Sequence, residues 1–250
     1  MSVAEARALL EVASRVVVLC GAGMSTRSGI PDFRGPNGVW TRNPEAEKLS
    51  TLEHYLADPE VRRRAWRGRL DHRAWSADPN AAHHALVDLE RQGRLHTIVT
   101  QNIDGLQQAA GSDPERIVEI HGTMREVTCM SCGWRGPMEE TLERVRGGED
   151  DPPCQVCGGI LKSATISFGQ SLVAEDLDRA FQAAADADLL LAAGSTLSVY
   201  PVAQMVPIAV SNGVPVVIVN GEPTEMDRLA DVVVVGDLTE VLPAMVARGE

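Results

Sequence analysis

The residues VVVLCGAGMST at positions 16–26 form an apolar run that ends in a glycine-rich turn. The apolar part, residues 16–20, has the length of a buried strand and is far too short to span a membrane. Glycines at positions 21 and 23 let the backbone approach an anion, and the start of a following helix offers N–H groups to it. A strand, a glycine turn and a helix in this order predict a phosphate-binding loop in an α/β domain.

The rest of the chain continues this alternation. Buried strands are expected at 95–100, 187–193, 214–220 and 232–235, and helices at 3–14, 81–92, 170–185, 201–212 and 238–248. Buried strands that alternate with helices indicate a parallel sheet with helices on both faces. The predicted fold class is therefore α/β, with a Rossmann-like parallel sheet.

Two segments interrupt the alternation. Residues 39–80 have helical periodicity without a strand pattern, and residues 125–160 hold four cysteines and an acidic loop. We expect both to be insertions that together form one smaller module, one part helical and the other a zinc ribbon. The Rossmann-like domain is then discontinuous, with segments 1–38, 81–124 and 161–250.

The net charge of the chain limits its partners. A formal charge of −12 over 250 residues argues against direct binding of nucleic acid, because phosphate binding needs a basic surface. The N-terminus has no leader-peptide pattern and no apolar stretch of membrane-spanning length, so we expect a cytoplasmic protein without membrane contact. The oligomeric state is not set by the sequence, which is compatible with a monomer.

Four of the five cysteines form two CxxC pairs, Cys129 with Cys132 and Cys154 with Cys157. Each pair can present two thiolates to one tetrahedral Zn²⁺, and residues 133–153 leave enough chain for a small ribbon. Four thiolates close the coordination shell, so we expect a structural zinc and not a catalytic one. A redox dithiol and unrelated buried cysteines are the alternatives.

The glycine turn differs from that of a dehydrogenase. The dinucleotide fingerprint GxGxxG needs glycine where Thr26 stands, and an acidic residue about twenty positions further on, at the end of a second strand. Here the chain continues instead into the loop GIPDFRGP, residues 29–36. A nucleotide site is still expected, but hydride transfer fits poorly.

Further motifs follow in order along the chain. They are GAGMS at 21–25, GIPDFR at 29–34, TQNIDGL at 100–106, IHG at 120–122, the two CxxC pairs, FGQ at 168–170, GSTL at 194–197 and VN at 219–220. In kind, order and spacing this series resembles the sirtuin family of NAD⁺-dependent protein deacylases. The resemblance extends over about residues 8–245.

The resemblance implies that NAD⁺ and an acyl-lysine peptide bind in the cleft between the Rossmann-like domain and the smaller module. By position, the residues that it assigns to the NAD⁺ site are Gly21, Ala22, Gly23, Ser25, Thr26, Ile30, Pro31, Asp32, Phe33, Arg34, Gln101, Asn102, Asp104, Gly194, Ser195, Thr196, Asn220, Gly221, Glu222 and Leu238. It assigns catalysis to His121, with Asn102 and Asp104 beside it. An imidazole suits a general base because its ordinary pKa lies near neutral pH. The implied products are nicotinamide, O-acyl-ADP-ribose and free lysine.

The resemblance also implies that the substrate peptide binds as an added strand, mainly through its main chain. The residues expected on the substrate side are Ile103, Ile166, Phe168, Gly169, Gln170 and Val199. Two departures from the family pattern fall here, Ser163 for proline and Gln170 for glutamate. They put the peptide preference in doubt more than the chemistry.

The preferred acyl group can be inferred from a residue pair, Tyr-x-x-Arg, that some sirtuins use to bind acidic acyl chains. Counting back without gaps from residues 79–83, those positions fall on Ala65 and Gly68. We therefore expect a preference for neutral acyl groups. Mono-ADP-ribosyl transfer to protein is an alternative reaction, and an NAD⁺-sensing zinc-ribbon interaction protein without activity is an alternative of another class.

Overall fold

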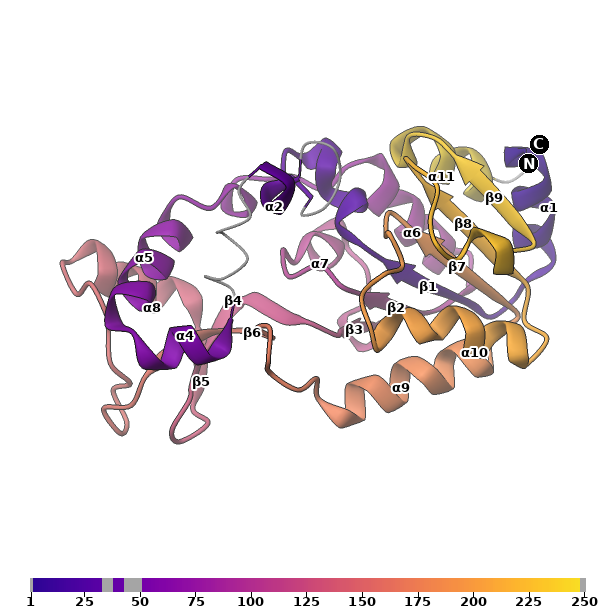
Figure 1. The fold of residues 1–250 in the computed structure, drawn as a ribbon. Helices are drawn as coiled ribbons and strands as arrows, with labels where there is room; N and C mark the ends of the chain where they lie inside the picture. The colour runs from indigo at the N-terminus through magenta and orange to yellow at the C-terminus, as the bar shows by residue number, and fades with distance from the viewer. Residues whose placement is uncertain (1, 33–37, 43–50, 248–250) are drawn as a thin grey trace.

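A computed structural model describes residues 2–32, 38–42 and 51–247. Figure 1 shows two lobes, a large one built around a twisted sheet and a small one that holds the second sheet. The expected Phe33 and Arg34 contacts lie outside the described residues.

The large lobe contains a six-stranded sheet in the order β3-β2-β1-β7-β8-β9, in which every neighbouring pair is parallel. Its strands are β1 (Val16–Cys20), β2 (Leu95–Thr100), β3 (Ile117–Glu119), β7 (Leu189–Ala193), β8 (Val216–Asn220) and β9 (Val232–Val235). The chain extends the sheet first on one side of β1 and then, from β7, on the other. Strand order therefore reverses between β1 and β7, and in open α/β sheets ligands bind at such a switch point, beyond the carboxyl ends of the strands.

Helices cover both faces of this sheet, as expected (Figure 1). One face packs against α1 (Val3–Val12), α6 (Ala81–Arg91) and α11 (Leu238–Val246), and the other against α9 (Ala174–Ala185) and α10 (Met205–Ser211). Successive residues of β1 alternate between the two cores, with Val18 on one face and Leu19 on the other. This double burial is the reason that β1 has no polar residue.

Several elements differ from the expectation at their ends. The helix expected from residue 170 begins at 174, the helix expected at 201–212 divides into η4 (Val202–Gln204) and α10, and the glycine turn leads into the 3₁₀-helix η1 (Ala22–Ser28). The hydrophobic pattern does not give the bounds of the strand β3, the helix α7 (Leu106–Ala110) or the short 3₁₀-helices η3 (Pro114–Arg116) and η5 (Asp227–Leu229). All are about five residues or shorter, too short for a hydrophobic period to develop.

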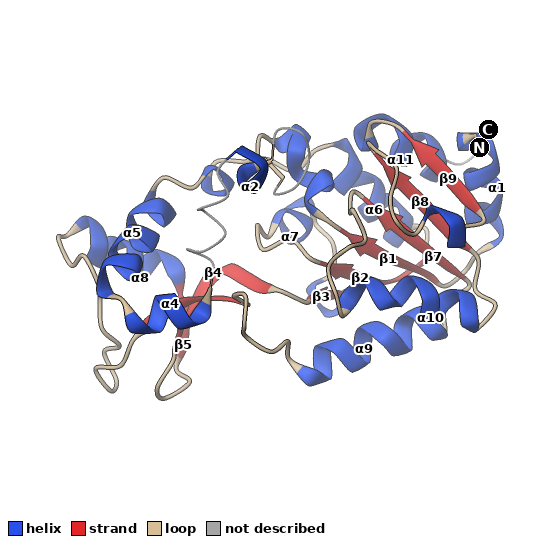
Figure 2. Ribbon diagram, in the orientation of Figure 1, coloured by secondary structure: helices blue, strands red, loops and turns tan. Residues whose placement is uncertain are grey.

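The small lobe combines both insertions around one core. Its antiparallel sheet, β5-β4-β6, consists of β4 (Gly122–Cys129), β5 (Arg135–Pro137) and β6 (Leu161–Thr165). Its described helices are α4 (Leu52–Ala57), α5 (Pro59–Leu70), η2 (Arg73–Trp75) and α8 (Met138–Arg146), and the short helix α2 (Val39–Arg42) lies between the two lobes in Figure 1. Trp66 of α5 is fully buried against Met138 and Leu142 of α8. The two insertions thus form one module, as their sequences led us to expect; Figure 2 shows its mainly helical character.

The strand β6 pairs with β4 and not with the parallel sheet. It lies after residue 160, where we had placed the return to the Rossmann-like domain. The division of the chain into domains stays a proposal, and we now draw its last boundary after Thr165, where pairing with β4 ends.

The two lobes meet where β4 begins, at Gly122. Its φ of +69° is in the left-handed region, and a Cβ built on it would lie 2.0 Å from the carbonyl oxygen of Ala164 on β6. Glycine is therefore required here both by conformation and by the closeness of the neighbouring strand.

We expect Gly122→Ala to lower the free energy of unfolding by about 3 kcal/mol, since it adds a steric conflict to left-handed strain. The matched control is Gly213→Ala, at a φ of +73° with no atom within 4 Å of the added Cβ, where strain acts alone. Denaturant unfolding of both variants measures the difference. Equal losses in the two variants would show that the approach of β6 does not constrain position 122.

Candidate active site and metal centre

The loops after β1 and β7 are in direct backbone contact at the switch point. The amide of Gly21 donates to the carbonyl oxygen of Ala193 at 3.0 Å, and that of Gly23 to the carbonyl oxygen of Gly194 at 2.8 Å. A Cβ on Gly21 would lie 2.5 Å from the Gly194 oxygen, and one on Gly194 would lie 2.6 Å from the Met24 nitrogen. The glycines therefore do more than admit an anion, because they allow these two loops to interlock.

Asp104, in the loop between β2 and α7, contacts this region through its side chain. Its Oδ2 accepts a hydrogen bond from the Ser25 hydroxyl at 2.7 Å, and its Oδ1 accepts the amide of Leu106 at 2.9 Å. Both Asp104 and Ser25 are buried, so these charge-assisted bonds are shielded from water. The carboxylate stabilises the start of α7 and the glycine loop together.

Asn102 lies beside it and faces the same loop. Its Nδ2 donates to the carbonyl oxygen of Gly21 at 3.0 Å and to the Ser25 hydroxyl at 3.3 Å. Asn102 and Asp104 thus approach Ser25 together, and the loops 21–25 and 101–105 meet.

His121 follows β3 and is held by the backbone of Gln101. Its Nδ1 lies 3.0 Å from the carbonyl oxygen of Gln101. A carbonyl oxygen can only accept, so Nδ1 carries the hydrogen and, in the neutral ring, Nε2 is the basic nitrogen. The Gln101 side chain in turn donates to the Ser195 hydroxyl at 2.9 Å. These contacts connect the loops after β2, β3 and β7.

The other residues expected at the NAD⁺ site lie on the loops around this centre. Thr26 donates through its hydroxyl to the carbonyl oxygen of Gly23, and Ile30 through its amide to that of Ser25. Asn220 ends β8, and its side chain donates to the carbonyl oxygen of Glu222 at 2.8 Å. Leu238 differs from these residues because it does not lie on a loop. It is the first residue of α11 and is only 6% exposed, within the core of the large lobe.

The substrate-side residues are anchored to the same elements. The amide of Ile166 donates to the carbonyl oxygen of His121 at 2.7 Å, and that of Met124 to the carbonyl oxygen of Ile103 at 3.0 Å. Phe168 is partly exposed, and its carbonyl oxygen accepts the amide of Leu52, at the start of α4. Gln170 accepts the Ser167 amide through Oε1 at 3.2 Å, so its side chain closes its own turn.

Two buried titratable side chains of the large lobe have structural roles. His83 is 2% exposed, its Nδ1 accepts the Asn80 amide at 3.2 Å, and burial lowers the pKa of its imidazole to about 4. Cys20 is buried on β1, where desolvation and the Asp104 charge raise the pKa of its thiol to about 12. A neutral imidazole and a protonated thiol in such surroundings are packing residues.

The four cysteines of the small lobe converge. The Sγ atoms of Cys129 and Cys157 are 3.5 Å apart, those of Cys132 and Cys154 are 3.9 Å apart, and all four lie within 4.8 Å of one another. A tetrahedral zinc ion with Zn–S bonds of about 2.3 Å needs sulfurs about 3.8 Å apart. The donor set therefore fits Zn²⁺ with a closed shell, which makes the site structural.

Comparison with known proteins identifies the chain. The model of the Sir2 family matches residues 21–201, most of the chain. The chain belongs to the Sir2 family. A Streptomyces coelicolor relative, NAD-dependent protein deacetylase 2, is 50% identical over 92% of this chain and 95% of its own length. An NAD-dependent protein deacetylase of Sulfurisphaera tokodaii is 40% identical over 95% and 92%.

Solved Sir2 structures share the fold over nearly the full chain. One, described as a Sir2–p53 peptide–NAD⁺ complex, has a TM-score of 0.86 at 33% identity and covers 97% of this chain and 96% of its own. Another, of Sir2 with a deacetylated p53 peptide and 3′-O-acetyl ADP ribose, has a TM-score of 0.87 at 33% identity and covers 98% and 97%. None of the helices within residues 2–32, 38–42 and 51–247 combines the length and apolar surface that a membrane span requires.

Three polar residues of this Sir2 protein have contacts that the sequence did not reveal. The Asn80 side chain donates to the carbonyl oxygen of Met24 at 2.8 Å, and Lys162, 1% exposed, donates to the carbonyl oxygens of Ser163 and Thr165. Burial lowers the pKa of the Lys162 ammonium to about 8. The third is Arg125, on β4. Asn80 could have been found as a helix N-cap, but no local pattern indicates its partner 56 residues away.

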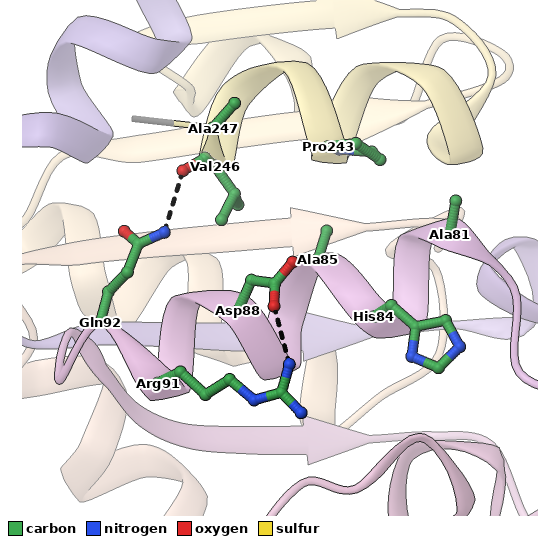
Figure 3. Close-up of a pocket in the computed structure, with 9 residues that line it drawn as sticks. All are labelled: Ala81, His84, Ala85, Asp88, Arg91, Gln92, Pro243, Val246 and Ala247. Atoms are coloured by element: carbon green, nitrogen blue, oxygen red, sulfur yellow. Dashed lines mark hydrogen bonds and ion pairs between the residues drawn. The ribbon is translucent and has the colours of Figure 1, made fainter. Parts of the chain in front are cut away.

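A groove of about 760 Å³ lies between α6 and α11 (Figure 3). It is lined by Ala81, His84, Ala85, Asp88, Arg91, Gln92, Pro243, Val246 and Ala247, none of which is a predicted site residue. Arg91 pairs with Asp88, and Gln92 donates to the carbonyl oxygen of Val246. Its polar groups thus bond mainly to one another, and the groove is distinct from the candidate active site.

We expect about one zinc ion per chain, and its loss when the pair Cys129→Ser and Cys132→Ser removes half of the ligands. The small lobe should then melt at a lower temperature, because the metal links β4 to the loop before β6. Zinc content by atomic emission and thermal unfolding measure both effects, with Cys20→Ala as the control that keeps its zinc. Full zinc content in the double variant would contradict this assignment.

Proposed function

We propose that this chain is an NAD⁺-dependent protein-lysine deacylase that yields nicotinamide, O-acyl-ADP-ribose and free lysine. The observation that carries the proposal is the fixed tautomer of His121 at the switch point, beside Asn102 and Asp104. A protein that only binds NAD⁺ has no use for a histidine held as a base. The deacetylase relatives support the same activity.

The geometry supports the following residues as the NAD⁺ site. The turn at 21–25 and Ser195 flank the switch point, where pyrophosphate oxygens can meet backbone N–H groups and a hydroxyl. Asn220, the last residue of β8, and Glu222, whose carbonyl oxygen it bonds, would hold the adenosine ribose, as the resemblance to the family implies. Leu238 packs in the core, so any contact with the adenine would involve the edge of its side chain.

NAD⁺ supplies a ribose carbon that bears a cationic leaving group, nicotinamide. Asn102 and Asp104 would orient the carboxamide of that group, since both are held against Ser25 and cannot swing away. The Asp104 carboxylate is buried, which favours the positive charge that develops on the ribose. Holding the substrate amide oxygen in line with this carbon, away from water, supplies much of the rate.

His121 would accept the proton of a ribose hydroxyl at Nε2. The Gln101 carbonyl oxygen stabilises the protonated ring through Nδ1–H, so the imidazole keeps its orientation in both states. The deprotonated 2′ oxygen would then attack the acyl carbon, whose oxygen is by then bonded to C1′, and the lysine nitrogen would leave with a proton from His121. Water would add to the acyl carbon, and cleavage of its bond to the C1′ oxygen would give O-acyl-ADP-ribose. Because the Gln101 side chain also donates to Ser195, the base would be positioned by the loop that is proposed to hold the phosphates.

The acyl-lysine peptide would lie between residues 166–170 and 197–200. Ile166 is tied to His121 by its amide, which places this segment directly beside the base. A solved Sir2 structure bound to a propionylated peptide, with a TM-score of 0.85 at 32% identity, supports a substrate of this type. The exposed side chain of Phe168 is suited to the apolar part of the acyl-lysine.

We expect His121→Gln to lower acyl-lysine turnover by a factor of about 10² or more, since glutamine cannot accept the proton. The matched control is His84→Gln, an exposed histidine on α6 that should keep full activity. Mass spectrometry of the products identifies O-acyl-ADP-ribose. Transfer of ADP-ribose to protein without deacylation would instead support the alternative transferase reaction, and unchanged turnover in His121→Gln would refute the mechanism.

We expect acetyl-lysine and longer neutral acyl-lysine peptides to be better substrates than succinyl-lysine peptides. The positions at which acidic-acyl sirtuins carry their Tyr-x-x-Arg pair are Ala65 and Gly68, neither of which can bind a carboxylate. Comparison of kcat/KM over a panel of acyl peptides of one sequence measures this preference. Faster turnover of the succinyl peptide would overturn it.

A further inference from the structure

Arg125, the fourth residue of β4, contacts the loop that carries Asn102 and Asp104. Its Nε and Nη2 both donate to the carbonyl oxygen of Asp104, at 3.0 and 2.8 Å. Nη2 also donates to the carbonyl oxygen of Ala74 at 3.1 Å, and the guanidinium carbon lies 5.0 Å from the centre of the Trp75 ring. One side chain thus connects β4, the 3₁₀-helix η2 of the helical insertion and the loop after β2.

Asp104 is held from two sides as a result. Ser25 and the Leu106 amide bind its carboxylate, whereas Arg125 binds its backbone oxygen. The neighbouring Met124 amide holds the carbonyl oxygen of Ile103 in the same way. The position of the Asp104 side chain therefore depends on contacts with the large lobe, and the position of its main chain depends on contacts with the small lobe.

This arrangement needs an arginine. Only a planar guanidinium can direct two N–H groups at one carbonyl oxygen, reach a second one and stack on an indole ring. Arg125 has no salt bridge to any carboxylate in residues 2–32, 38–42 and 51–247. Its bonds to carbonyl oxygens, and not an ion pair, account for its position, and the residue as a whole is exposed.

We propose that Arg125 is a positioning residue that sets Asp104 for the reaction and transmits the position of the small lobe to the nicotinamide end of the NAD⁺ site. The proposal rests on the proposed function. Arg125 itself does not contact the substrate in this role. Its effect passes through Asp104, whose carbonyl oxygen it binds.

The test compares Arg125→Lys and Arg125→Ala with the same changes at Arg116. Arg116 is a matched control because its guanidinium also donates to a backbone carbonyl oxygen, that of Leu95 at 2.8 Å, but it contacts no predicted site residue. Steady-state turnover gives kcat and the KM values for NAD⁺ and for an acetyl-lysine peptide. Calorimetric titration with NAD⁺ and thermal unfolding accompany it.

We expect kcat/KM for NAD⁺ to fall about tenfold in Arg125→Lys and further in Arg125→Ala, because a displaced Asp104 orients NAD⁺ poorly. The KM for the peptide should stay within about twofold, and millimolar guanidinium should restore part of the activity of Arg125→Ala but not act on the Arg116 variants. NAD⁺ parameters equal to those of the wild type would overturn the proposal. Equal losses toward NAD⁺ and peptide with a lowered melting temperature and no rescue would also overturn it, by showing a purely structural role.

Failure of the proposed function has a different signature. A wild-type protein that binds NAD⁺ but turns over no acyl-lysine peptide would refute the deacylase activity. The titration would still decide the role of Arg125, since weaker NAD⁺ binding in Arg125→Ala but not in Arg116→Ala is expected there too.

Discussion

The backbone contact between the β1 loop and the β7 loop is the constraint on which the site depends. Gly21 and Gly23 approach Gly194 so closely that a single methyl group would separate them. The two strands are adjacent in the sheet, but their loops could diverge; the amide-to-carbonyl bonds at 21 and 23 keep them together. This contact fixes the shape of the switch point before any side chain is considered.

Hydrogen bonds connect the candidate catalytic residues to these two loops, one after another. The Ser25 hydroxyl donates to Asp104, and Asn102 donates to the Gly21 carbonyl oxygen. Gln101 donates to the Ser195 hydroxyl through its side chain and orients His121 through its carbonyl oxygen. Each bond joins two loops that come from different strands of one sheet. His121, the loop held by Asp104 and the glycine turn at 21–25 can therefore keep fixed distances from one another, although no single loop is rigid by itself.

The sequence predicted the strands and helices that have a regular hydrophobic pattern. It did not predict contacts between distant residues, which leave no local pattern. The bounds of β1, β2 and β9 agree with the expected ones, because an apolar run between breakers marks a buried strand sharply. The ordered motifs indicated the family, and the structure brings Ser25, Gln101, Asp104, His121 and Ser195 together. The helix α8 was missed within the cysteine segment, although Met138, Leu142 and Val145 have helical spacing. The Arg125–Asp104 bonds could not be predicted, since they depend on how two lobes meet and leave no local pattern.

The pairing of β1 with β7 has a consequence for synthesis of the chain. Val16 pairs with Leu189, so the central strand keeps one unpaired edge until most of the chain has left the ribosome. Contacts this distant in sequence form late and slowly, and they leave a partly made sheet open to wrong partners. A nascent chain that ends before β7 has only β1, β2 and β3 of the six-stranded parallel sheet and no switch point. Such a chain lacks the backbone bonds of Gly21 and Gly23 to the β7 segment, so the two halves of the proposed dinucleotide site come together only when the chain is nearly complete.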